Sequence, residues 1–240
     1  MKVVFAGPSL AGARRIQESD VEFRAPAIQG DVVRAVEEGA AVIGLIDGQF
    51  ETVAPVWHKE LLYALTAGVT VLGASSMGAL RAAECQDFGM RGIGQIFYDY
   101  ASGRRIDDAD VALLHGPAEL GYAPITVPLV NVDATLEKAV DEGLVDEDEA
   151  GQLHQSARRI FYKDRTWKGI GSVAGMPWPR LRELVEGCWT DQKLADALAL
   201  VDAINQGSER PSDPPPAWSF NTTPLWRELY DKSAKSSRCK

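Results

Sequence analysis

The chain contains few of the side chains on which disulfide, redox and metal chemistry depends. It has only three cysteines and three histidines among its 240 residues. Cys85, Cys188 and Cys239 lie far apart and form no Cys-x-x-Cys pair, which argues against a disulfide framework and against a zinc site. This cysteine usage is typical of a reducing compartment. We therefore expect a cytoplasmic protein whose site holds no metal ion and no cofactor.

Positive charge and long apolar runs are also scarce. The 25 Lys and Arg residues are outnumbered by 34 Asp and Glu residues, which gives a formal net charge of −9. This balance argues against binding to nucleic acid or to an anionic membrane surface. No apolar run approaches the ~20 residues of a membrane-spanning helix. The N-terminal segment is too short for a signal peptide and runs straight into a predicted strand.

What the sequence does contain is a regular alternation of short apolar runs and amphipathic segments. Lys2–Ala6, Ala41–Ile46 and Val69–Leu72 have the near-continuous apolar character of strands that are covered on both faces. Apolar residues recur at helical spacing in Val32–Glu38 and in Val56–Leu65. Strands that alternate with helices of about 10–12 residues predict an α/β fold with a doubly wound, mainly parallel sheet.

The remaining segments are assigned by the same criteria. Val21–Arg24 and Val111–Leu114 are predicted to be strands, and Phe88–Gly94 is predicted to be a loop. From Asn131 onward the spacing of apolar residues is helical. The predicted organisation has three regions: an α/β core over residues 1–128, a C-terminal helical region packed on it over 129–206, and a Pro-rich linker and tail over 207–240. Within the tail we predict a short helix over Pro224–Asp231, followed by a disordered end.

Polar residues follow three of the predicted strands at the point where each strand ends. Pro8 and Ser9 come after the first strand, Asp47 follows Ala41–Ile46, and the serine turn Gly73–Gly78 follows the strand that begins at Val69. In an open parallel sheet, ligands bind beyond the carboxyl ends of the strands. We therefore expect these residues to line one crevice, with Pro8 and Ser9 in contact with the substrate.

The serine turn is the stretch around which the rest of the chain is organised. It carries Ser75 and Ser76 and leads directly into Ala79–Glu84, a run of strong helix formers. The first turn of such a helix has free backbone N–H groups, which favour negative charge. The spacing Ala74-x-Ser76-x-Gly78 differs by one residue from the Gly-x-Ser-x-Gly turn of hydrolases. Two interpretations remain open: a serine caps the helix, or a serine is a nucleophile or an anion contact.

Six stretches of the sequence also share a pattern with a known family. They are Phe5–Leu10, Ile43–Gly48, Val56–Glu60, Gly73–Glu84, Ala112–Gly121 and Phe161–Trp167. Together these stretches resemble the TfuA-like family over about residues 3–168, roughly two-thirds of the chain. The combination is specific, although no single stretch is.

The resemblance implies a role in the thioamidation of a ribosomally made peptide. TfuA-like proteins are partners of a YcaO-type, ATP-dependent enzyme that replaces a backbone amide oxygen with sulfur. The activity implied is that of a hydrolase that acts on the thiocarboxylated C-terminus of a small ThiS-like sulfur carrier and thereby frees sulfide for the YcaO partner. The alternative is a non-catalytic adaptor that binds the carrier or the peptide and activates the YcaO enzyme.

Hydrolysis of a thiocarboxylate is acyl transfer from an anion, and it needs a nucleophile, a base and donors for the developing oxyanion. For this reaction we predict Ser76 as the nucleophile, with Ser75 as the second choice. The backbone N–H groups of Met77 and Gly78 are the candidate oxyanion donors, because they lie at the predicted start of the helix.

The candidate bases are histidines. His115 is preferred, because it follows a predicted strand in a Gly-Pro loop, and the alternative for it is a hydrogen bond to that loop. His58 is the second candidate, for which a structural or carrier-binding role is equally open. Asp47 is predicted to orient a histidine as a triad acid does, and the alternative for it is a turn with Gly48.

Cationic groups are needed to offset the charge of the substrate. Lys59 and Arg81 are the candidate anion clamps, and a salt bridge from Arg81 to Glu84 is an equally good interpretation of that residue. Three more residues are candidates for substrate contact: Glu119, Lys163 and Arg165. For the cluster Lys163-Asp164-Arg165, the alternative is a solvated helix end or a surface ion pair.

Overall fold

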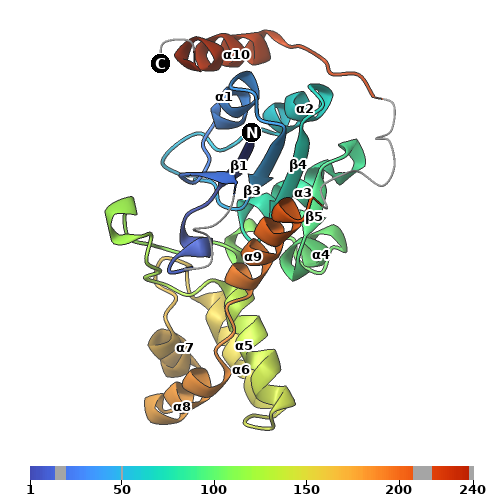
Figure 1. The fold of residues 1–240 in the computed structure, drawn as a ribbon. Helices are drawn as coiled ribbons and strands as arrows, with labels where there is room; N and C mark the ends of the chain where they lie inside the picture. The colour runs from blue at the N-terminus through green and yellow to red at the C-terminus, as the bar shows by residue number, and fades with distance from the viewer. Residues whose placement is uncertain (14–19, 50, 208–217, 238–240) are drawn as a thin grey trace.

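Five short parallel strands form the centre of the protein. The computed structural model describes residues 1–13, 20–49, 51–207 and 218–237. In it the strands pair in the order β2-β1-β3-β4-β5, each parallel to its neighbours (Figure 1). Their bounds are β1 Lys2–Phe5, β2 Val21–Arg24, β3 Val42–Leu45, β4 Thr70–Ala74 and β5 Arg91–Ile93.

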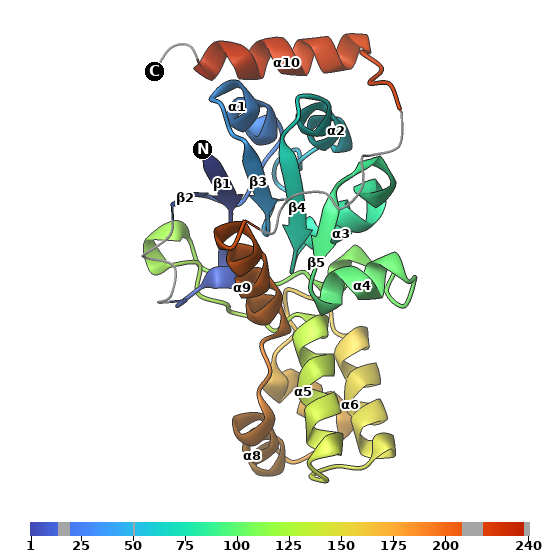
Figure 2. The same ribbon diagram turned by 45° about the vertical axis from the view of Figure 1, so that its right-hand side comes forward.

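Helices cover both faces of this sheet. Val3 and Ile43 point to one face, where they form a single buried cluster with helices α1, α2 and α3. Val4 and Leu72 point to the other face, where Leu200 and its neighbours in α9 cover them (Figure 2). Because both faces are covered, the central strands β1, β3 and β4 are mostly apolar and buried, whereas the edge strands β2 and β5 carry charged residues. The prediction of a doubly wound parallel fold is confirmed. The helices are α1 Asp31–Glu37, α2 His58–Thr66, α3 Met77–Cys85, α4 Gln95–Ala101 and α9 Gln192–Asn205.

Four further helices form a lobe with a core of its own. In Figure 1 this lobe lies on the side of the sheet toward which the strand arrows point. Leu136, Leu153, Ile170 and Leu181 meet in its centre, each 3% exposed or less. After the lobe the chain returns to the sheet as α9, so the first turn of α9 comes to lie beside the carboxyl ends of the strands. The helices of the lobe are α5 Leu129–Asp141, α6 Glu147–Arg159, α7 Trp167–Ala174 and α8 Trp178–Cys188.

The last helix lies at the opposite end of the molecule from this lobe (Figure 1). It is α10, Pro224–Ser237, and it packs on α1 while Trp226 stacks on Tyr63 with ring centroids 5.2 Å apart. The sequence predicted a helix only as far as Asp231 and a disordered end after it; the helix in fact continues to Ser237, and Ser233 and Ala234 in this extension are buried. The predicted Pro-rich linker lies almost wholly outside the described residues, and the division into three regions stays a prediction.

Two of the secondary-structure predictions are wrong. Arg91–Ile93 was predicted to be part of a loop, but it is the edge strand β5. Gly92 interrupts the apolar pattern by which a strand is identified. A glycine is required there because a Cβ would lie 1.9 Å from the ring of Phe97. Val111–Leu114 was predicted to be a strand but runs outside the sheet in irregular conformation, and its polar groups find side-chain partners such as Thr126. No helix in the described ranges is long and apolar enough to span a membrane.

Candidate functional site

A cavity of about 320 Å³ lies at the carboxyl ends of the central strands. Pro8 after β1, Asp47 after β3 and Ser76 after β4 all line it, and so do His115 and Lys163. From β1 the chain continues to β2, which pairs with one edge of β1, and then to β3, which pairs with the other edge. The strand order therefore reverses between β1 and β3, and the cavity lies at this point. This is the position in which doubly wound sheets bind their ligands, and we call it the strand-end crevice.

The serine turn between β4 and α3 has an unusual backbone. Ser75 has a φ of +67°, in the left-handed region that side-chain-bearing residues rarely adopt. Ser76 is the residue before α3, and its side chain makes no capping hydrogen bond to the helix. The interpretation of either serine as a helix cap is therefore not supported. Strained backbone of this kind occurs often at functional sites.

The two serine hydroxyls contact the same distant residue. Ser75 Oγ donates to the backbone carbonyl of Lys193 at 2.8 Å, and Ser76 Oγ lies 3.0 Å from Lys193 Nζ. Ser75 is fully buried, whereas Ser76 is 9% exposed and lines the strand-end crevice. Ser75 therefore holds the backbone of the turn, and Ser76 is the serine that a substrate can reach.

Lys193 is a group at this site that the sequence analysis missed, as it did Glu51 and Tyr162. It lies in the first turn of α9, is 2% exposed and lines the crevice. Its side-chain nitrogen Nζ is 3.0 Å from Ser76 Oγ and 2.8 Å from the carbonyl oxygen of Val111. Burial lowers the pKa of Lys193, and the nearby carboxylates of Asp47 and Asp191 oppose this shift.

A signal for Lys193 was present in the sequence. Lys193, Ala197, Leu200 and Ile204 recur at helical spacing and form the buried face of α9. A lysine on the apolar face of an amphipathic helix is unusual, because an ammonium group is costly to bury. The contact of Lys193 with Ser76 was not predicted, because the two residues lie 117 positions apart in the chain.

Close packing fixes the start of α3 against the sheet. A Cβ on Gly78 would lie 1.7 Å from the carbonyl oxygen of Leu45, and a Cβ on Gly73 would lie 2.1 Å from that of Gly78. The Gly78 N–H donates to Ile46 O at 3.1 Å, so it is not free to bind an oxyanion as predicted. Met77 is the first residue of α3, and its N–H has no acceptor among the described residues.

Asp47 does not orient a histidine. Its carboxylate accepts hydrogen bonds from the Gly7 N–H at 2.8 Å, from the Ser9 N–H at 3.0 Å and from the Ser9 hydroxyl at 2.7 Å. These bonds hold the 3₁₀ turn Pro8–Leu10 that follows β1. Ser9 is thereby buried beneath the turn, and Pro8 faces the crevice. Asp47 shapes the wall of the crevice and places a negative charge near Lys193.

The two candidate histidines lie in different places. His115 lines the crevice, and its Nδ1 is 2.7 Å from the carbonyl oxygen of Gly116. Because a carbonyl only accepts, Nδ1 carries the proton and Nε2 is the acceptor in the neutral ring. His58 lies at the start of α2, outside the crevice lining, with its Nε2 2.7 Å from Glu84. The structure does not bring His58 to Ser76.

The predicted cationic contacts are mostly engaged elsewhere. Arg81 pairs with Glu84 at 2.7 Å, which is the alternative that its sequence spacing allowed. Lys59 donates to Asn221 O at 2.6 Å and so anchors the segment before α10. Lys163 is the exception, because it lines the crevice and pairs there with Glu51 at 2.6 Å.

The last two predicted contacts also lie outside the crevice lining. Arg165 is 4% exposed and donates to the carbonyl oxygens of Ala157 and Ile160, so it caps the end of α6. Burial lowers the pKa of Arg165. Glu119 is exposed in the 3₁₀ turn Ala118–Leu120.

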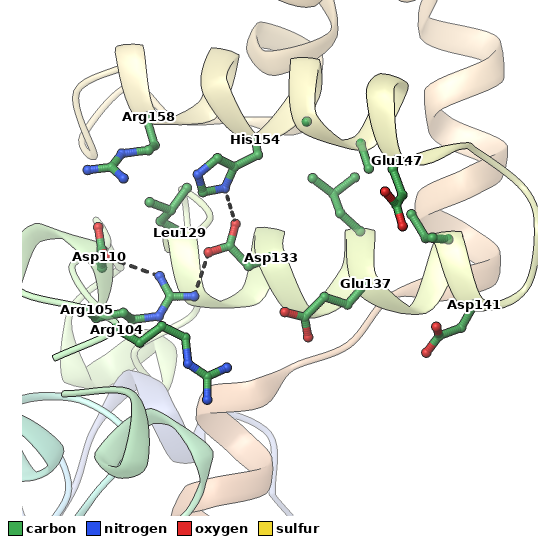
Figure 3. A pocket seen from close by; sticks show the side chains of 14 residues that line it. Arg104, Arg105, Asp110, Leu129, Asp133, Glu137, Asp141, Glu147, His154 and Arg158 are labelled. Carbon is green, nitrogen blue, oxygen red and sulfur yellow. Dashed lines mark hydrogen bonds and ion pairs between the residues drawn. The ribbon is translucent and has the colours of Figure 1, made fainter. Parts of the chain in front are cut away.

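A second and larger cavity, of about 540 Å³, lies between α5 and α6 (Figure 3). Asp133 lies at one end of it, between Arg105 at 2.5 Å and His154 at 2.6 Å. Arg105 also contacts Asp110, so Asp110, Asp133, Arg105 and His154 are linked in one network at this end. The cavity holds no nucleophile close to a base, which distinguishes it from the strand-end crevice. In the described part of the chain, no cluster of three His, Cys, Asp or Glu side chains could hold a metal ion.

A comparison with known protein families matched a range that includes several residues of the strand-end crevice. A family model described as TfuA-like protein matches residues 47–166, half of the chain, and this range contains Asp47, Ser76, His115 and Lys163. Lys193 lies beyond it. No curated protein matches the chain. The family is linked to YcaO-associated thioamidation. On the strength of the matched range, this chain belongs to the TfuA-like family.

Proposed function

We propose that this protein is a cytoplasmic hydrolase that releases sulfide from the thiocarboxylated C-terminus of a ThiS-like sulfur carrier, for use by a YcaO partner. The observation that carries the proposal is the position of Ser76. Its hydroxyl makes no helix cap, lies directly before the first turn of α3 and lines a crevice at the strand ends. A serine in this position resembles the nucleophile of hydrolases built on similar sheets.

The crevice suits the tail of a carrier protein. A cavity of about 320 Å³ admits a few extended residues but not a folded domain, so the substrate enters as a flexible C-terminal end. The substrate end is an anion, and the start of α3 favours negative charge. Lys163 also lines the crevice, but Glu51 balances its charge there, so the start of α3 is the group that offsets the repulsion between the thiocarboxylate and the nucleophile.

The reaction proceeds in two acyl transfers. Ser76 Oγ attacks the carbonyl carbon, its proton passes to a base, and the Met77 N–H stabilises the oxyanion. The C–S bond then breaks, sulfur leaves with the returned proton, and an ester of Ser76 remains. Water hydrolyses this ester, so one thiocarboxylate and one water give one carboxylate and one hydrogen sulfide.

The test uses the purified full chain and the thiocarboxylated carrier, without the YcaO enzyme. Sulfide released over time is the readout. We expect the wild type to release sulfide steadily and the release rate to fall at least about 100-fold in Ser76→Ala, since single catalytic groups contribute in this range. Ser219→Ala, at an exposed position far along the chain, is the matched control. Equal release by Ser76→Ala would rule the proposal out.

The adaptor function is the second candidate, and one observation favours it. Leu114, Leu120, Ile125 and Phe161 are exposed apolar side chains on the segments that include the crevice wall, at 39–68% exposure. Contiguous patches of exposed apolar residues mark protein interaction surfaces. An adaptor would release no sulfide alone, and Ser76→Ala would still stimulate the YcaO partner.

A further inference from the structure

The contact between Ser76 and Lys193 has the geometry of a nucleophile with its base. Ser76 Oγ and Lys193 Nζ are 3.0 Å apart, within the 2.6–3.2 Å over which a side chain abstracts a proton. Ser76 immediately precedes α3 and Lys193 lies in α9, and these two helices pack on opposite faces of the sheet. Their meeting point lies in the strand-end crevice, which both residues line.

Burial of Lys193 favours a neutral amine over an ammonium ion. Among the described residues two groups surround Nζ, Val111 O and Ser76 Oγ. An ammonium only donates, whereas a neutral amine has two N–H groups and one lone pair, so the neutral form can donate to Val111 O and accept the proton of Ser76. At 2% exposure there is little water to solvate the charge of an ammonium.

Charged groups near this amine come from several elements. Asp47, at the end of β3, and Asp191, before α9, both favour the protonated form. The carboxylate of Asp47 is already occupied by the turn after β1, so it makes no direct ion pair with Lys193. His115, Glu51 and Lys163 line the same crevice, where Glu51 and Lys163 neutralise each other.

We infer that Lys193 is the general base of this site and forms a catalytic Ser–Lys pair with Ser76. This inference rests on the proposed function only for the role of Ser76. As the Ser76 Oγ–C bond forms, the Oγ–H proton moves to Lys193 Nζ and the carbonyl electron pair moves to oxygen. Lys193 returns that proton to the departing sulfur, and then takes a proton from the water that cleaves the ester. Serine–lysine pairs catalyse acyl transfer on unrelated folds.

The experiment measures covalent labelling of Ser76 by a fluorophosphonate, followed by intact mass and peptide mapping. Ser76 Oγ attacks phosphorus, the P–F bond breaks, fluoride leaves, and Lys193 takes the proton. The expected result is labelling of wild-type protein at Ser76 and a rate at least 100-fold lower in Lys193→Met. Lys193→Arg keeps a cation that cannot act as a base, and it is expected to be as slow. Lys168→Met, at an exposed position of α7, is the matched control with wild-type rate.

A second measurement needs no variant, in case Lys193→Met fails to fold, as judged by its thermal transition. The labelling rate of the wild type is expected to rise with pH through one ionisation and to reach a plateau below the ordinary lysine pKa of about 10.4. A folded Lys193→Met that labels at the wild-type rate would overturn the inference. So would wild-type protein that is not labelled at Ser76, or a labelling rate that does not rise with pH.

The labelling experiment and the sulfide experiment fail independently. If Ser76 is labelled in a Lys193-dependent way but the carrier releases no sulfide, the Ser–Lys pair stands and the proposed substrate is wrong. If the carrier is hydrolysed at the same rate by Lys193→Met, the proposed function stands and the assignment of the base is wrong.

Discussion

Ser75 Oγ donates a hydrogen bond of 2.8 Å to the backbone carbonyl of Lys193, while the next serine contacts the amine of the same lysine. Two neighbouring residues on one helix start therefore hold both the main chain and the side chain of α9 at its first turn. This double contact joins the two faces of the sheet at the crevice. It makes Ser75 a positioning residue for the pair formed by Ser76 and Lys193.

Ser75→Ala tests this positioning role. The substitution removes the bond to Lys193 O without changing the strained φ, and we expect the free energy of unfolding to fall by about 1 kcal/mol. Labelling of Ser76 is expected to slow while its pH dependence keeps the same shape, because the base is still present. Chemical denaturation and the fluorophosphonate rate are the measurements. An unchanged rate would show that the start of α9 needs no such anchor.

Gly78→Ala tests the close approach of α3 to β3. The new Cβ would meet Leu45 O at 1.7 Å, so the helix start has to move away from the sheet. We expect a loss of at least about 2 kcal/mol in unfolding free energy, as for other overpacked cores, together with loss of Ser76 labelling. Gly151→Ala is the control: no atom lies within 4 Å of its Cβ in helix α6, and it should stabilise by about 0.5–1 kcal/mol. Equal stability of the two variants would contradict the packing argument.

Glu60 predicts a pH dependence of stability. Burial raises its pKa from 4.5 to about 7, although the backbone N–H groups of Trp57 and Gly30 donate to it. Because the folded-state pKa is the higher one, its stabilising contribution is full below pH 4.5 and is lost as the pH rises through 7. At about 1.4 kcal/mol per pKa unit, the loss amounts to roughly 3 kcal/mol.

The measurement is the free energy of unfolding between pH 4.5 and 8, for the wild type and for Glu60→Gln. The glutamine cannot ionise, so the difference between the two proteins should change across this range in the direction of a relatively less stable wild type at high pH. A constant difference would show that Glu60 keeps its ordinary pKa in the folded protein.

Asp47→Asn separates the two roles of Asp47. Loss of the negative charge removes a group that favours protonated Lys193, so the pKa of Lys193 falls further and the pH midpoint of Ser76 labelling moves to lower pH. The amide accepts fewer of the hydrogen bonds from Gly7 and Ser9, and we expect a loss of about 1–3 kcal/mol in stability. Asp141→Asn, at the other cavity, should leave the midpoint unchanged. A shift to higher pH would contradict the electrostatic account.

The sequence predicts those parts of the structure that are determined by residue patterns within a single stretch of the chain. The apolar runs of β1 and β3 fix a parallel sheet, and the residues that follow them reach one crevice because parallel strands end at one edge. The serine turn was recognised because a strand, a turn and a helix follow one another in a single stretch. The edge strand β5 was missed because Gly92 breaks the apolar pattern to make room for Phe97.

The parts that were not predicted depend on contacts between distant segments. Lys193 reaches Ser76 only because the chain forms a lobe of four helices and then returns to the sheet. The roles of Asp47 and Arg165 were likewise decided by partners that local spacing does not reveal, namely the turn after β1 for Asp47 and the end of α6 for Arg165.

The central claim is that Ser76 is acylated by the carrier. The most direct measurement is the mass of the protein after it is mixed with thiocarboxylated carrier and quenched in acid within the first turnover. The account predicts an adduct of protein plus carrier minus hydrogen sulfide, located at Ser76 and absent in Ser76→Ala. Sulfide release without such an adduct, at a rate that Ser76→Ala shares, would contradict it.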